Sequence, residues 1–258
     1  MNSLCNRSRG ISPWKVKPLG GLSSSALKIL AIVLMISDHL WATVIPGNNW
    51  MTYLGRIAFP IFAFQITEGY FHTSDKKQYQ KRLFIAALIS EIPFNLLMMS
   101  SPIFPFHQNV MFTLLLGLRA MDGLEFIRQN PSGKFIARGL LRLAACAILA
   151  VVGFVDYGLT GLLTILVFYI FRGFPLAWLG QLIAMVFLHV ILFEGQTIPI
   201  AFGSNIHYFP TQGFAVFSLL PIWLYNGEKG QGGKVLQYGS YLFYPAHMLL
   251  LHLARTLF

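Results

Sequence analysis

Long apolar runs alternate with short polar segments along almost the whole chain. A membrane-spanning helix needs about 20 consecutive, mostly apolar residues, and several of the runs reach that length. The pattern therefore predicts an all-α fold, a polytopic transmembrane bundle of about nine helices. Their approximate bounds are 26–45, 53–71, 83–99, 109–121, 137–155, 158–171, 176–193, 213–225 and 236–253.

Composition supports this class of protein. Of the 258 residues, 55% are hydrophobic and only 11% are charged, and the mean hydropathy is +0.62. A soluble domain carries roughly 25% charged residues, so this chain lacks the polar surface to face water on all sides. The net charge of +10 does not indicate nucleic acid as a partner, because the Lys and Arg residues lie in short clusters between the apolar runs. The lipid bilayer is the expected surrounding.

The basic clusters predict an orientation in the membrane. Segment 1–25 and the connections after the second, fourth, sixth and eighth helices are basic, whereas the other connections carry no Lys or Arg. Basic connections face the cytoplasm. We therefore expect a multi-pass protein with a cytoplasmic N-terminus and an external C-terminus, divided into a basic cytoplasmic tail, 1–25, and a membrane domain, 26–258.

Two features of the N-terminal segment bear on processing and on disulfides. A signal peptide is an alternative for segment 1–25, since a basic region precedes an apolar one. Against it, the run 26–45 is long enough to span a bilayer and lacks a small-residue cleavage site.

Cys5 lies in the tail and Cys146 in an apolar helix, so we expect no disulfide between them.

Titratable residues inside two apolar runs mark the candidate site. Asp38 and His39 lie within the first run, and Arg56 lies near the start of the second, after a short polar turn. A charge inside hydrocarbon costs about 2.5–3.5 kcal/mol on insertion scales, so such residues usually have a function. The predicted orientation places all three in the outer half of the membrane.

Other polar residues are predicted at two depths. Asn109, Asp156, Tyr157 and His247 belong to the outer half, where they would bind an acceptor substrate. Glu68 lies near the inner end of its helix, close to Lys76 and Lys77, and Glu91 lies in the next helix along the chain. These two carboxylates could line a route for a cofactor that enters from the cytoplasm.

Structural interpretations compete with these assignments. Arg56 could anchor its helix at the lipid interface, and Glu68 could join two helices. His189 and His252 are lone histidines, which we interpret as hydrogen-bonding partners of neighbouring helices. The common soluble catalytic signatures, including metal-binding motifs, are absent from the sequence, so we expect no metal.

Several segments resemble the TraX family of pilin acetylation proteins. They are ALKILAIVLMISDHLW, GRIAFPIFAFQITEGYFHT, ISEIPFN, QNVMFTLLLGL, VDYGLTGLL and YPAHMLLL, in this order along most of residues 26–252. The resemblance implies a bacterial inner-membrane acetyltransferase that uses acetyl-CoA as acyl donor. The acceptor would be the N-terminal amine of a pilin or an envelope glycan.

The resemblance extends to wider groups of membrane acyltransferases in which a histidine is central, and His39 is the matching position. His39 would then be the general base, and Asp38 would orient it or bind another helix. Arg56 would stabilise the oxyanion or pair with Asp38. Two other functions remain open: a transporter or flippase, and a non-catalytic partner in pilus or envelope assembly. No internal repeat is evident, which counts modestly against the transporter.

Overall fold

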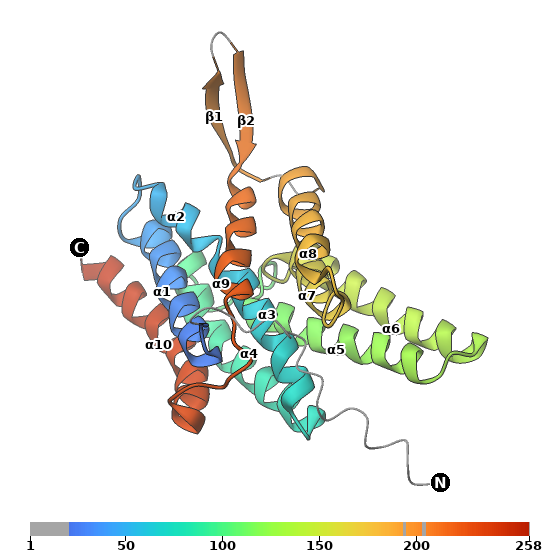
Figure 1. Cartoon of the computed structure of the whole chain (residues 1–258). Coiled ribbons are helices and arrows are strands. Elements are labelled where there is room, and N and C mark those ends of the chain that lie inside the picture. Colours follow the sequence, from blue (N-terminus) through green and yellow to red (C-terminus); the bar gives the residue numbers. More distant parts are fainter. Residues whose placement is uncertain (1–20, 193–194, 203–204, 258) are drawn as a thin grey trace.

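The computed structural model describes residues 21–192, 195–202 and 205–257, which form a helical bundle with one β-hairpin (Figure 1). The all-α prediction is confirmed at this level. In chain order the elements are α1 (Ser24–Thr43), α2 (Trp50–Gly55), α3 (Ala58–His72), α4 (Lys76–Met99), α5 (Val110–Gln129), α6 (Gly133–Val152), α7 (Gly158–Ile170), α8 (Ala177–Val186), the π-helix η1 (Phe187–Leu192), β1 (Thr197–Phe202), β2 (Asn205–Pro210), the 3₁₀ helix η2 (Thr211–Ser218), α9 (Leu219–Trp223) and α10 (Gly233–Leu257).

The predicted helix 53–71 is wrong as a single element, because it is interrupted at Arg56 and Ile57. Pro60 explains the break. A proline has no N–H to donate to the carbonyl four residues earlier, which is that of Arg56, and its ring crowds that carbonyl. Helix α2 therefore ends at Gly55, and α3 begins at Ala58 with Pro60 in its first turn. The interruption places Arg56 in a short connection between two helices.

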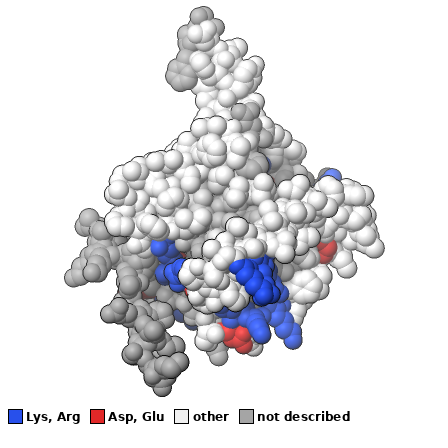
Figure 2. Space-filling view, turned by 90° about the vertical axis from the view of Figure 1, so that its right-hand side faces the viewer, with Lys and Arg blue, Asp and Glu red and all other residues white. Residues whose placement is uncertain are grey.

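The segment 194–211, which carried no helical prediction, contains an antiparallel hairpin. β1 and β2 pair in a register that places Ile200 opposite His207. Their β-branched and aromatic residues suit a pleated strand. The hairpin projects from one end of the helical body, beyond α2 and α8 (Figure 1). On the face shown in Figure 2, Lys and Arg gather at the end opposite to the hairpin.

Three helices within the described ranges are long and apolar enough to cross a bilayer by themselves: α1, α4 and α6. Apolar side chains remain exposed along one side of α4, where Leu88, Ile89 and Ile92 are 53–60% exposed. Such a surface is stable against lipid and not against water. The chain is therefore a membrane protein. Fewer such spans occur among the described residues than the nine predicted. Four of the apolar runs, 53–71, 158–171, 176–193 and 213–225, fold as shorter or interrupted helices.

Helix α3 is the central helix of the bundle. Most of its residues are buried, and it packs against α1, α5, α7 and η2. Helix α10, from the end of the chain, packs beside both α1 and α4. The tail predicted at 1–25 lies mostly outside the described residues, as does Cys5, but Leu22 within it pairs with the C-terminal part. Its backbone N–H donates to the carbonyl of Leu224 at 2.7 Å, which brings the start of α1 beside the segment that precedes α10.

Candidate functional site

Two histidines from opposite ends of the chain meet between α1 and α10. Nδ1 of His39 is 2.8 Å from Nε2 of His247, and the two rings are parallel to within 1°. Nδ1 of His247 is 2.9 Å from the carbonyl oxygen of Phe243, one turn earlier on α10. The sequence pointed to both histidines separately, as a base and as a substrate-binding residue. The structure shows that they form a pair.

Hydrogen bonding defines which nitrogen of the neutral pair is basic. A carbonyl oxygen only accepts, so Nδ1 of His247 carries its proton and its Nε2 is an acceptor. His39 must then donate from Nδ1, which leaves Nε2 of His39 without a proton. An unprotonated imidazole nitrogen is the form that a general base requires. The pair therefore offers Nε2 of His39 as its basic atom.

Asp38, although adjacent to His39, contacts α2. Its Oδ1 accepts a hydrogen bond of 2.7 Å from the Thr52 hydroxyl. Gly55 makes the close approach of the two helices possible, because a Cβ at this position would lie 2.3 Å from Cβ of Asp38. Successive residues point about 100° apart on a helix with 3.6 residues per turn, so Asp38 and His39 contact different helices. Asp38 thus joins α1 to the segment that carries Arg56.

Arg56 lies among acidic and phenolic groups. Its side chain hydrogen-bonds that of Tyr157, and the carboxylates of Asp38 and Asp156 are close enough to interact with it electrostatically. Its Nε is buried and has no hydrogen-bond partner among the described atoms. A guanidinium has five N–H donors and no acceptor. Arg56 therefore retains a donor for the oxygen of a ligand.

The turn before α7 holds this cluster in place. Tyr157 stacks on Phe59 of α3, with 4.1 Å between ring centroids, and the backbone carbonyl of Asp156 accepts from the Thr113 hydroxyl of α5. The Asp156 carboxylate also pairs with His107, with 3.7 Å between Oδ1 and Nε2. The interaction with the Asp156 carboxylate raises the pKa of His107 above its ordinary value, against the opposing effect of burial. Asp156 therefore interacts with both Arg56 and His107.

Glu91 has a partner on α5. Nδ2 of Asn109 is 2.5 Å from Oε2 of Glu91, and Oδ1 of Asn109 accepts from the backbone N–H of Met111, which caps the helix. Asn109 is fully buried. The interaction joins α4 to the start of α5. Glu91 does not line the large cavity that is described next and that could admit a cofactor.

That cavity, the central cavity, has a volume of about 740 Å³ and lies among α1, α3, α4, α5, α10 and segment 225–233. Small-molecule sites commonly measure about 300–1,000 Å³. Along α1 its lining ends at Met35, and along α10 it ends at Phe243 and Tyr244. Met35 and Phe243 each stand four residues before a histidine of the pair, which is about 6 Å along a helix axis. The central cavity therefore leads towards His39 and His247.

The opposite end of the central cavity is cationic. Lys28 and Lys229, beside the start of α1, line this end, and Arg82 lines the cavity from α4. Nε of Arg82 is buried without a hydrogen-bond partner among the described atoms. The Ser25 hydroxyl donates to the carbonyl of Lys229 at 2.8 Å, which holds segment 225–233 beside the start of α1. The sequence analysis did not identify these residues as a site, because orientation in the membrane already explained the basic clusters. A lysine within the first apolar run was the available signal.

Glu68 lines the central cavity, but its charge is compensated within the protein. Nε and Nη2 of Arg172 lie 2.7 and 3.4 Å from its two carboxylate oxygens, and Arg172 also lies over the ring of Phe71, 4.1 Å from its centroid. The structure thus shows the role in joining helices that the sequence left open for Glu68, with Arg172 as the partner. This partner is distant in sequence and reaches Glu68 because α7 packs on α3.

His189 is a structural residue, as its sequence context suggested. It is fully buried in η1, where Nε2 lies 3.0 Å from the Thr164 hydroxyl and Nδ1 lies 3.3 Å from the amide nitrogen of Gln212. Both ring nitrogens are engaged by neighbouring helices.

Fold and site together define a helical membrane protein with an internal cavity leading to a histidine pair. Residues 23–255 match the family described as TraX protein, and the chain belongs to this family, which confirms the resemblance of its motifs. A relative from Dichelobacter nodosus, the "Probable fimbrial assembly protein FimC, serogroup H1", is 28% identical over 250 residues, covering 90% of this chain and 96% of the relative. No solved structure matches the chain.

Proposed function

We propose that this protein is an acetyltransferase that moves an acetyl group from acetyl-CoA to an acceptor amine or hydroxyl across the bacterial inner membrane. The observation that carries the proposal is the central cavity, which is cationic at one end and ends about one helical turn from a histidine with a free basic nitrogen. The relative's name, fimbrial assembly protein, supports a pilus-related acceptor such as a pilin N-terminal amine, with an envelope glycan as the second choice.

The central cavity fits the shape and charge of the donor. Lys28, Arg82 and Lys229 would bind the phosphates of acetyl-CoA, for which charge-assisted hydrogen bonds are the strongest available contacts. Lys28 and His39 are eleven residues apart, which is about 16 Å along a helix. This separation suits an extended pantetheine arm between phosphates at the cationic end and a thioester beside His39. The apolar side chains of Ile32 and Met35 line the path between them.

The candidate residues would divide the chemistry among them. His39 Nε2 would take the proton of the acceptor as its nitrogen or oxygen bonds to the acetyl carbon, and would return that proton to the departing sulfur as the carbon–sulfur bond breaks. His247 would hold the ring of His39 throughout by accepting from its Nδ1. Arg56 would donate from Nε to the developing oxyanion. Asp38 would position Arg56 through α2.

The orientation in the membrane connects the two sides of the reaction. In the proposed topology the nine apolar segments place the basic connections and the N-terminus in the cytoplasm and the C-terminus outside. The cationic end of the central cavity would then face the compartment that contains acetyl-CoA. His39 and Arg56 would lie towards the external face, where Asp156 and Tyr157 would line the approach of the acceptor.

The test uses purified protein in detergent with radiolabelled acetyl-CoA, and a peptide with a free N-terminal amine or an amino sugar as acceptor. The wild type should bind the donor and release CoA as acceptor is labelled. His39→Gln should lower transfer by about 10²–10⁴-fold with donor binding unchanged, since this is the usual contribution of a general base. His189→Gln is the matched control and should retain activity if it remains folded.

The donor site has its own pair of variants. Lys28→Gln with Lys229→Gln should raise the KM for acetyl-CoA without lowering kcat. Lys77→Gln, on the exposed start of α4 and outside the cavity lining, should change neither value. Absence of both donor binding and CoA release in folded wild-type protein would refute the proposal and favour a non-catalytic role in assembly or a transporter.

A further inference from the structure

We propose that a second cavity, between α5 and α6, binds the phosphate of an anionic glycerophospholipid through Arg119 and Arg142. The inference does not depend on the acetyltransferase proposal. This second cavity has a volume of about 620 Å³ and is separate from the central cavity, with which it shares no lining residue. Its lining is amphipathic, because Lys76, Arg119 and Arg142 lie beside the apolar side chains of Leu116 and Leu149.

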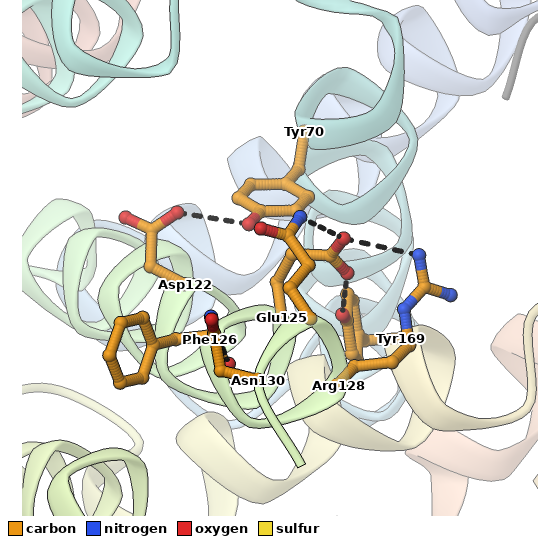
Figure 3. Close-up of polar contacts among 8 residues, drawn as sticks. Tyr70, Asp122, Glu125, Phe126, Arg128, Asn130 and Tyr169 are labelled. Carbon is orange, nitrogen blue, oxygen red and sulfur yellow. Dashed lines mark hydrogen bonds and ion pairs between the residues drawn. The ribbon is translucent and has the colours of Figure 1, made fainter. Parts of the chain in front are cut away.

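The two carboxylates of the second cavity, Asp122 and Glu125, already have hydrogen-bond partners, most of which Figure 3 shows. Asp122 accepts from the Tyr70 hydroxyl at 2.9 Å and from the Gln80 amide at 2.5 Å. Glu125 accepts from three side chains, namely Tyr169 at 2.8 Å, Gln129 at 2.8 Å and Arg128 at 3.1 Å. Among the described residues, neither acid forms an ion pair with Arg119 or Arg142, which line the same space.

The cations of the second cavity, in contrast, lack anionic partners. Arg142 lies over the ring of Phe126, 4.3 Å from its centroid, and Lys76 lies 3.8 Å from the centroid of Tyr70. Contacts with ring faces leave N–H donors free for an anion. Over the described part of the chain, none of Lys76, Arg119 and Arg142 forms an ion pair with a carboxylate. Charges next to hydrocarbon are normally paired with an opposite charge, so we expect an external anion to bind in this cavity.

The arginines lie on the side of the bundle where the basic residues of α4 gather. The hydrogen bond between Gln80 and Asp122 aligns α5 with the first turns of α4, which are rich in lysine and arginine. Arg119 is three residues from Asp122, about 4.5 Å along the helix. It therefore lies about level with Arg82, the last of the basic residues at the start of α4. Basic pockets between membrane helices on the cytoplasmic side, which is the proposed side of these residues, bind anionic head groups.

The apolar end of the second cavity provides a track for acyl chains. Leu149 is 54% exposed, and its neighbours Ile148 and Val152 on α6 are 59% and 65% exposed. These side chains extend the cavity lining along a helix long and apolar enough to cross the bilayer. A free phosphate would use the cationic end alone, whereas a glycerophospholipid would use both ends. The amphipathic lining favours the lipid.

The test measures binding to purified, delipidated protein in detergent by native mass spectrometry and by thermal shift. Phosphatidylglycerol, phosphatidylcholine and inorganic phosphate are compared as ligands. The variant Arg119→Gln with Arg142→Gln should weaken phosphatidylglycerol binding roughly 25-fold, at roughly fivefold for each cation near a membrane surface. The matched control is Lys134→Gln with Arg138→Gln, which removes the same charge from α6 outside the cavity lining and should bind as the wild type does.

A second variant leaves the charges intact. Ala145→Trp would fill the apolar end of the cavity from an exposed position on α6, and should weaken phosphatidylglycerol binding if the acyl chains lie there. Equal losses in the arginine variant and its control would overturn the site in favour of general surface charge. If inorganic phosphate raised the melting temperature as much as phosphatidylglycerol does, the lipid would be excluded as the ligand. Binding of phosphatidylcholine as tight as that of phosphatidylglycerol would overturn the preference for an anionic head group.

Discussion

Replacing Arg172 with Gln should strongly destabilise the protein, because it leaves Glu68 buried without its counterion. Glu68 is 6% exposed and is held by Arg172 at 2.7 and 3.4 Å. Its other cationic neighbour, His72, is 3.4 Å away with a side chain that is 63% exposed, and compensates the charge less well. Removing one member of a buried ion pair typically costs about 3–5 kcal/mol of unfolding free energy. The Arg172→Gln variant should lose an amount in this range.

Thermal unfolding in detergent measures the effect. For a chain of this size a loss of 1 kcal/mol lowers the midpoint by about 2–4 °C, so Arg172→Gln should unfold roughly 6–20 °C below the wild type. Arg128→Gln is the matched control. Arg128 is the ion-pair partner of Glu125, and its side chain is 72% exposed. An ion pair at such an exposed position contributes about 0–1 kcal/mol to stability.

The double variant Glu68→Gln with Arg172→Gln should regain much of the lost stability, since two neutral amides can hydrogen-bond each other in place of the ions. A midpoint for Arg172→Gln that equals that of Arg128→Gln would refute the reasoning. It would mean that another group compensates the charge of Glu68 or that water reaches it.

Three further predictions follow from the topology, a close helix contact and an ion pair. A reporter that is active only outside the cytoplasm should be active when fused after Asn48, Pro105 and Phe258 and silent after Lys77, Lys134 and Gly230; activity at Gly230 with silence at Phe258 would contradict nine crossings. Gly55→Ala should cost about 1–3 kcal/mol, because its Cβ would lie 2.3 Å from that of Asp38, whereas Gly239→Ala, with nothing within 4 Å, should be neutral or stabilising in a thermal melt. Asp156 raises the pKa of His107, so the pair should stabilise the folded protein fully below about pH 6.5, and this stabilisation should be lost as the pH rises through the raised pKa. Asp156→Asn should remove this dependence from a series of melts, and an unchanged pH profile would count against the pair.

The class of protein and most of the helical segments could be predicted from the sequence. A long apolar run must satisfy its own backbone hydrogen bonds in a membrane, and a helix does so locally. As far as the structure describes them, the nine apolar segments fold as helical structure, although the run 53–71 breaks at the carbonyl of Arg56, four residues before Pro60. The sequence alone also identified Asp38, His39 and Arg56, since ionisable residues are costly and therefore rare within apolar membrane segments.

The partners of these residues depended on tertiary structure. His39 meets His247 across 208 residues, and Glu68 meets Arg172 across 104. The cationic end of the central cavity combines Lys28, Arg82 and Lys229 from three separate parts of the chain. In a soluble protein, apolar periodicity indicates which face of a helix is buried. In a membrane, lipid tails are as apolar as Leu, so the same pattern does not distinguish a face that packs on protein from one that faces lipid. The sequence alone therefore determined which residues are exceptional, and only the packing of the helices decided which of them form a site.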